Sequence, residues 1–190
     1  LTHGRLRVVD RNAVKLIRSY RVIRHDLLTG EQGVTPSQFR EASRQITGTI
    51  FKDIVETQTL NPDQTVILMP WRAGLAFGEA ASRNGFRYFF HLGAKRNEET
   101  LETEIYYQEM PALMTTNNPE RNQHLQAIIA DPMLATGNTM TDAVERLKDL
   151  GIQEKNITIV SVISAPEGID HILSRFPDLK IVVGSHDEKL

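Results

Sequence analysis

The stretch that most constrains the fold is residues 126–141, QAIIADPMLATGNTMT. An apolar run at residues 127–130 is typical of a buried strand, and it places Asp131 at the carboxyl end of that strand. A turn of small and polar residues follows, and apolar residues at helical spacing begin at Met140. A strand, a small-residue loop and a helix N-terminus together predict a phosphate site, because loop N–H groups and the helix dipole both favour an anion.

The kind of phosphate follows from the residues around this turn. No lysine follows the glycine, so the G-x-x-x-x-G-K-[ST] motif of nucleoside triphosphate loops is absent. An acidic residue just ahead of the loop suits a sugar phosphate, because a carboxylate accepts hydrogen bonds from ribose hydroxyls.

The motif DPMLATGNT resembles the phosphoribosyl diphosphate (PRPP) signature of type I phosphoribosyltransferases. DPMLATG, with Pro132 where most of that superfamily carries a second acid, is similar to the uracil phosphoribosyltransferases in particular. The resemblance implies that Asp131 binds the ribose and that the following loop binds the 5′-phosphate. The residues it assigns to PRPP in this motif are Asp131, Pro132, Met133, Leu134, Ala135, Thr136, Gly137, Asn138 and Thr139.

A second motif, MPWRAGLAFGEA at residues 69–80, places Arg72 after a predicted strand, in a turn of small residues. A guanidinium there can contact a phosphate through two parallel hydrogen bonds. The motif resembles the P-I-L-R-A-G-L-G pattern of the same family, which implies that Arg72 contacts the diphosphate of PRPP and that a non-proline cis peptide lies near it. Trp71 replaces the family's leucine. It either reshapes the substrate pocket or fills core volume, and both interpretations stay open.

A charged segment at residues 93–111, GAKRNEETLETEIYYQEMP, follows an apolar run. R-N-E-E-T-L-E at residues 96–102 resembles the flexible flap of uracil phosphoribosyltransferases, which implies that Arg96 contacts PRPP. Lys95 stands where that family has tyrosine. The alternative is a solvated hairpin without a ligand.

Strand and helix signals alternate over residues 65–183, which predicts the α/β class with a mostly parallel central sheet flanked by helices. This is the type I phosphoribosyltransferase fold that the resemblance implies, with a flap hairpin. We expect a single domain over residues 1–190, in which an N-terminal helical segment, residues 1–60, packs on an α/β core, residues 61–190.

The N-terminal segment combines a basic stretch with one long helix. Six arginines between residues 5 and 24 are interleaved with apolar residues, and we expect amphipathic packing with solvated arginines. A surface for polyphosphate or nucleic acid is the alternative. Thr35 and Pro36 predict a helix start, and apolar spacing continues to about Val55, as in a plain core helix.

Composition excludes several classes of function. There is no cysteine, so disulfides, thiolate metal sites and cysteine nucleophiles are ruled out. A net charge of −2 argues against nonspecific nucleic-acid binding. No run approaches the roughly 18 apolar residues of a membrane span, so we expect a cytoplasmic protein without a membrane partner. The six histidines show no metal-ligand spacing, so no protein metal site is predicted.

The resemblance also implies the activity. It implies transfer of the phosphoribosyl group of PRPP to uracil in pyrimidine salvage, giving UMP and diphosphate. Asp131, Arg72 and Arg96 would be the catalytic residues, and Mg²⁺ would bind through PRPP. PRPP and a nucleobase, expected to be uracil, would be the small-molecule partners, and a homodimer or higher homo-oligomer is expected.

Two departures from the family leave alternatives open. The β-arm that usually precedes the first core strand is missing or nearly so, and the glycine-rich C-terminal loop that reads the uracil edge is not in the sequence. The chain is either incomplete or divergent. A PRPP-binding regulatory or orphan paralogue without a base pocket, and a phosphoribosyltransferase for another base, therefore both remain alternatives.

Overall fold

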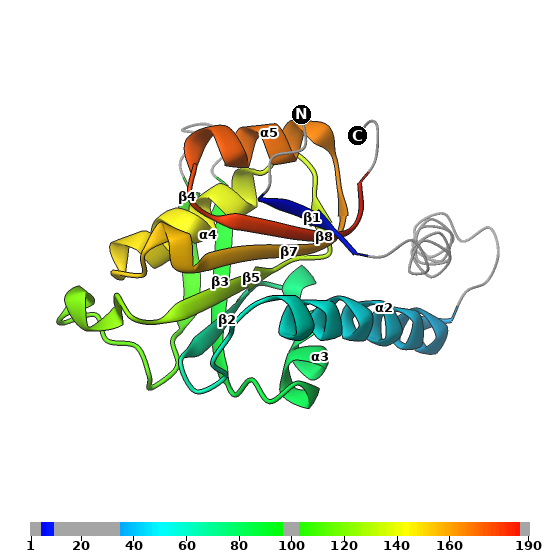
Figure 1. Ribbon diagram of the computed structural model, residues 1–190, viewed down its shortest axis with the longest axis horizontal. Coiled ribbons are helices and arrows are strands. Elements are labelled where there is room, and N and C mark those ends of the chain that lie inside the picture. Colours follow the sequence, from blue (N-terminus) through cyan, green and yellow to red (C-terminus); the bar gives the residue numbers. More distant parts are fainter. Residues whose placement is uncertain (1–4, 10–34, 97–102, 187–190) are drawn as a thin grey trace.

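The computed structural model describes residues 5–9, 35–96 and 103–186, and its centre is a twisted sheet (Figure 1). The strand order is β1-β8-β7-β5-β2-β3-β4, with β6 paired to β7. Every described pairing is parallel except that of β3 with β4. The strands are β1 (Leu6–Val8), β2 (Thr65–Pro70), β3 (Tyr88–Arg96), β4 (Thr103–Glu109), β5 (Gln126–Ala130), β6 (Met133–Leu134), β7 (Ile157–Ser164) and β8 (Lys180–His186).

Helices cover both faces of this sheet. Figure 1 shows α4 and α5 on one side and α2 and α3 on the other. The predicted α/β fold, with a mostly parallel sheet flanked by helices, is confirmed. The α-helices are α2 (Pro36–Thr57), α3 (Gly78–Arg83), α4 (Asn138–Asp149) and α5 (Pro166–Arg175), and short 3₁₀ helices occur at η1 (Ala73–Phe77), η2 (Pro119–Asn122) and η3 (Glu154–Asn156).

The core consists of two apolar layers, one on each face of the sheet. All six residues of β2 are buried, as expected for a parallel strand covered on both sides. Successive side chains of a strand point to opposite faces. Val66 and Leu68 accordingly join the layer under α4 and α5, and Ile67 and Met69 join the layer under α2 and α3.

The predicted N-terminal boundary of α2 is confirmed. Thr35 caps the helix, and the backbone N–H of Gln38 donates to the Thr35 hydroxyl at 3.3 Å. The Gln38 side chain in turn accepts from the Thr35 N–H at 2.8 Å, which completes a capping box. Residues 58–64 alone connect α2 to β2, so this described connection has no room for a β-arm.

Two strands were not predicted: β1, and the two-residue β6, which lies within the predicted loop after Asp131. Leu6–Val8 form an edge strand beside β8, with Leu6 opposite Ile181 in parallel register, where the sequence suggested only helical packing. The N-terminal stretch therefore contributes to the sheet as well as to the helical layer.

Two of the N-terminal arginines have structural contacts. Arg7 forms a two-point ion pair with Asp53 of α2, at 2.8 and 2.7 Å. Arg5 donates to the Phe176 carbonyl at 3.2 Å. The other four arginines lie outside the described residues, so the expectation of solvated arginines stays a prediction for them.

The antiparallel β3–β4 pair is the predicted flap hairpin. It begins at His91 opposite Glu109 and ends at Arg96 opposite Thr103, with a register shift beside Gly93. Residues 97–102, which complete the predicted flap, lie outside the described residues. None of the helices in the described part of the chain has the length and apolar character needed to cross a membrane.

Candidate active site

A pocket of about 790 Å³ opens where β2 and β5 end. Three parts of the chain line it: the first turns of α2, the segment that follows β2, and the loop from β5 to α4. All nine predicted loop residues, from Asp131 to Thr139, line this pocket, and Arg72 lines it as well. The parallel strands explain this meeting, because their carboxyl ends lie at the same edge of the sheet.

Asp131 is held at the end of β5 by its own backbone. Its N–H donates to the Val160 carbonyl of β7 at 3.1 Å, which extends the ladder by one residue. Its carboxylate accepts the N–H of Met133 at 3.2 Å. The residue is half-buried at the pocket wall. This turn therefore fixes the direction of the carboxylate, a group that can accept several hydrogen bonds at once.

The loop enters α4 through a glycine in the left-handed conformation. Gly137 is the N-cap residue, with φ 86° and ψ −4°, and it provides no side-chain cap. The first N–H groups of α4 thus have no side-chain acceptor at the cap and lie at the positive end of the helix dipole. A Cβ at Gly137 would lie 3.2 Å from the Gly168 carbonyl of α5, which leaves little room for another residue. This geometry suits a phosphate.

Arg72 follows β2 closely and is the N-cap residue of η1. The peptide bond between Trp71 and Arg72 is cis, which confirms the expectation for this turn. Arg72 is exposed and lies at the pocket. Two residues later, a Cβ at Gly74 would lie 2.5 Å from the Ala130 carbonyl oxygen, so the turn rests directly on the backbone of β5.

Arg96 is the last residue of β3 and pairs with Thr103 of β4. The structure therefore places it at the described end of the hairpin, as the flap prediction requires. Lys95 before it is exposed. Contact between Arg96 and a ligand remains a prediction.

The α2 wall of the pocket was missed from the sequence. The apolar residues Ile46, Ile50 and Ile54 do face the core, as predicted. The polar side of the first turns, however, brings Arg40 and Arg44 to the pocket. Their spacing of four residues on one helix was the available signal.

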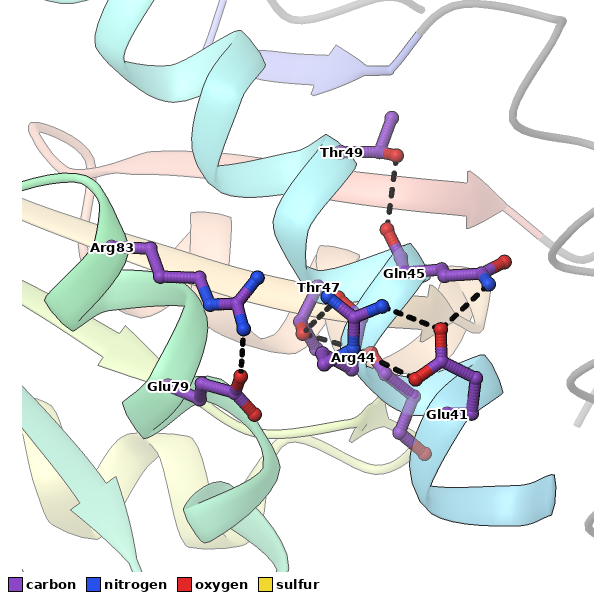
Figure 2. A network of polar contacts seen from close by, with 8 residues as sticks. Glu41, Arg44, Gln45, Thr47, Thr49, Glu79 and Arg83 are labelled. Carbon is purple, nitrogen blue, oxygen red and sulfur yellow. Dashed lines mark hydrogen bonds and ion pairs between the residues drawn. The ribbon is translucent and has the colours of Figure 1, made fainter. Parts of the chain in front are cut away.

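A network of polar contacts stabilises the side of the pocket that α2 forms. Arg44 donates two hydrogen bonds to Glu41, at 2.8 and 2.5 Å, and Gln45 donates a third at 2.9 Å. The Arg44 guanidinium, followed by the Gln45 amide, lowers the pKa of Glu41 to about 2. Figure 2 shows Glu79 and Arg83 of α3, joined at 2.7 Å, facing these α2 side chains. These hydrogen bonds to Glu41 hold the Arg44 side chain in place at the pocket.

Trp71 does not fill the core, and its effect on the shape of the substrate pocket stays a prediction. It is 39% exposed, so it is not a core filler, and it is not among the described residues that line the pocket. Its ring instead lies against Tyr107 of β4, with the ring centroids 4.5 Å apart. Its indole N–H donates to Nδ1 of His91 on β3 at 3.1 Å.

Comparison with known proteins agrees with this geometry. A family model described as uracil phosphoribosyltransferase matches residues 26–190. The chain is similar to the uracil phosphoribosyltransferase of Nicotiana tabacum, with 34% identity over 155 residues, which cover 77% of this chain and 66% of the relative. It is also similar to the uracil phosphoribosyltransferase of Aquifex aeolicus, with 40% identity over 69% of this chain and 58% of the relative. The chain thus spans less than two thirds of the length of these two relatives.

Solved structures show the same fold. The AQ2163 protein from Aquifex aeolicus superposes with a TM-score of 0.76 and 25% identity, over 97% of this chain and 88% of that one. A purine phosphoribosyltransferase from Pyrococcus horikoshii superposes with a TM-score of 0.57 and 16% identity, over 82% of this chain and 86% of that one. The second likeness concerns the fold alone.

Proposed function

This chain belongs to the uracil phosphoribosyltransferase family, and we propose that its pocket binds PRPP and transfers the phosphoribosyl group to uracil, giving UMP and diphosphate. One observation carries the proposal. The loop that follows Asp131 and the residue Arg72 line a single pocket, although they follow different strands of the sheet. A phosphate site and a guanidinium in one pocket suit a ligand with a phosphate at each end.

Each part of PRPP would contact a different group of residues. The N-terminal amides of α4, with the loop that leads into them, would hold the 5′-phosphate. The Asp131 carboxylate would accept hydrogen bonds from the ribose hydroxyls. Arg72, and Arg96 from the hairpin, would bind the diphosphate, because a guanidinium presents two parallel donors to phosphate oxygens.

The reaction is a displacement at ribose C1. The bond from C1 to the diphosphate oxygen breaks, a bond from C1 to uracil N1 forms, and N1 loses its proton. Negative charge grows on the leaving diphosphate and positive charge on the ribose ring. The protein would act mainly by positioning both substrates and by stabilising these charges with groups that are already in place.

Mg²⁺ would enter with PRPP, held mainly by diphosphate and ribose oxygens, and would supply positive charge to the diphosphate. The half-buried carboxylate of Asp131 at the pocket wall is a hard oxygen group of the kind that suits this ion. We further propose, from the family resemblance, that the protein is a cytoplasmic homo-oligomer. Sedimentation of the purified chain would test its oligomeric state.

Diphosphate release tests the proposed activity. The chain would be incubated with PRPP, Mg²⁺ and one base at a time: uracil, hypoxanthine, guanine or orotate. We expect release with uracil and formation of UMP. Release with another base alone would assign a different substrate, and PRPP binding without release would favour a regulatory protein.

A further inference from the structure

Trp71 joins two parts of the chain that each carry a predicted diphosphate ligand. It immediately precedes Arg72, and its backbone N–H donates to the Leu92 carbonyl of β3 at 2.8 Å. Its indole N–H donates to Nδ1 of His91, also on β3, at 3.1 Å. The turn after β2 is thus fixed to the hairpin through both the backbone and the side chain of one residue.

The second strand of the hairpin completes the contact. The Trp71 ring lies 4.5 Å from the Tyr107 ring of β4, centroid to centroid, and meets the His91 ring edge-on at 6.2 Å. The Tyr107 hydroxyl donates to Glu109 at 2.6 Å, and this bond raises the pKa of Tyr107. Glu109 is itself opposite His91 in the β3–β4 register. These four side chains form one cluster, which we call the Trp71 cluster.

The position of the cluster indicates what it can do. Arg96 ends the same β3 strand that carries His91, so the cluster links the Arg72 turn to the strand that bears Arg96. Trp71 is 39% exposed and is not among the described residues that line the pocket, so core packing does not account for it. We propose that Trp71 is a positioning residue, which sets the spacing between the Arg72 turn and the β3 strand that ends at Arg96, for a diphosphate-bearing ligand.

This inference rests on the proposed function and makes it more specific. Two guanidiniums bind one diphosphate well only at a suitable spacing, because charge-assisted hydrogen bonds depend on geometry. The 5′-phosphate site at α4 is built from β5, α4 and α5, whereas the contacts of the Trp71 cluster lie on β3 and β4. Loss of the cluster should therefore weaken diphosphate binding and spare phosphate binding at α4.

Calorimetric titration of the whole chain tests this separation. PRPP with Mg²⁺, inorganic diphosphate with Mg²⁺, and ribose 5-phosphate would be titrated into wild type, Trp71→Ala and Trp71→Phe. We expect Trp71→Ala to weaken PRPP and diphosphate binding by about tenfold and ribose 5-phosphate binding by less than about twofold. Trp71→Phe keeps a ring but loses the indole donor, so its loss should be intermediate.

The control is Tyr106→Phe, which removes a hydroxyl from an exposed aromatic residue of the same hairpin outside the cluster. It should bind all three ligands as wild type does. Trp71→Phe and His91→Phe each remove the same hydrogen bond. The double variant should therefore bind diphosphate no more weakly than whichever of these two single variants binds it more weakly.

Three results would overturn the inference. Unchanged diphosphate binding in both Trp71 variants would show that the cluster does not set the spacing. Equal losses for diphosphate and ribose 5-phosphate would show general damage. If wild type binds ribose 5-phosphate but neither PRPP nor diphosphate, the proposed function fails first and this inference fails with it.

Discussion

Gly74 and Ala130 lie so close together that a Cβ on Gly74 would be 2.5 Å from the Ala130 carbonyl oxygen. Gly74 is in η1, two residues after Arg72, and Ala130 ends β5, one residue before Asp131. The contact therefore fixes the distance between the backbones that carry the predicted diphosphate ligand and the predicted ribose ligand. A side chain on Gly74 would have to push these two segments apart.

Gly74→Ala should weaken PRPP binding and destabilise the fold. Overpacking at a backbone contact typically costs about 1–3 kcal/mol, and the displaced turn would carry Arg72 with it. Chemical denaturation would measure the loss of stability, and calorimetric titration would measure the loss of PRPP affinity.

The matched control for this change is Gly48→Ala, because nothing lies within 4 Å of a Cβ there. Gly48 is inside α2, so the variant should be stabilised by up to about 1 kcal/mol, since alanine favours a helix over glycine. If Gly74→Ala and Gly48→Ala had the same stability and the same PRPP affinity, the importance of the contact between Gly74 and Ala130 would be contradicted.

Asp131→Asn should fold normally and turn over slowly. The amide oxygen can still accept the Met133 N–H, which the carboxylate accepts at 3.2 Å, so the turn should persist. Loss of a charge-assisted contact that strengthens in the transition state typically lowers kcat by about 10²-fold or more. Steady-state rates at saturating PRPP, together with thermal unfolding, would test this. A near-wild-type rate would contradict a catalytic role for Asp131.

Arg72→Ala should lower kcat/KM by roughly 10²-fold, and Arg72→Lys should recover only part of the loss, because lysine restores the charge without the paired donors. Steady-state kinetics with PRPP and uracil would measure both changes. Arg87→Ala is the control, since Arg87 is also an exposed arginine near a strand end, and it pairs with Asp63 at 3.4 Å instead of lining the pocket. Full activity in Arg72→Lys would show that charge alone suffices.

Glu41 should add a small pH dependence to stability. Its pKa in the folded protein is lowered from 4.5 to about 2, mainly by the hydrogen bonds from Arg44. A lowered pKa stabilises the fold above the unfolded-state value, and this stabilisation is lost as the pH falls from about 4.5 through about 2. The effect should be modest, because the group is exposed and water screens it. Denaturation of wild type and Glu41→Gln across this window should show a steeper fall for wild type. If the free energy of unfolding falls equally with pH in both proteins, the lowered pKa of Glu41 would be refuted.

Elements with local signals could be predicted from the sequence. The strand before Asp131, the Thr35 cap and the apolar spacing of α2 all depend on residues close together in the chain, and each agrees with the structure. Leu6–Val8 was missed because three residues carry too little pattern, and its pairing with β8 depends on residues far along the chain.

The candidate site likewise has parts that could be predicted from the sequence and parts that could not. The loop after Asp131 and the turn at Arg72 were recognisable because each is a short continuous motif. Arg40 and Arg44 were overlooked because only the packing of α2 against η1 brings them to the pocket. The contacts of Trp71 likewise required the pairing of β3 with β4, which places two aromatic side chains beside it.

The central claim is that one pocket holds both ends of PRPP, and a crystal structure of the chain with PRPP and Mg²⁺ tests it most directly. We expect the 5′-phosphate on the N-terminal amides of α4, the ribose hydroxyls at Asp131 and the diphosphate at Arg72. A 5′-phosphate bound elsewhere, or an Arg72 guanidinium that points away from the diphosphate, would contradict it.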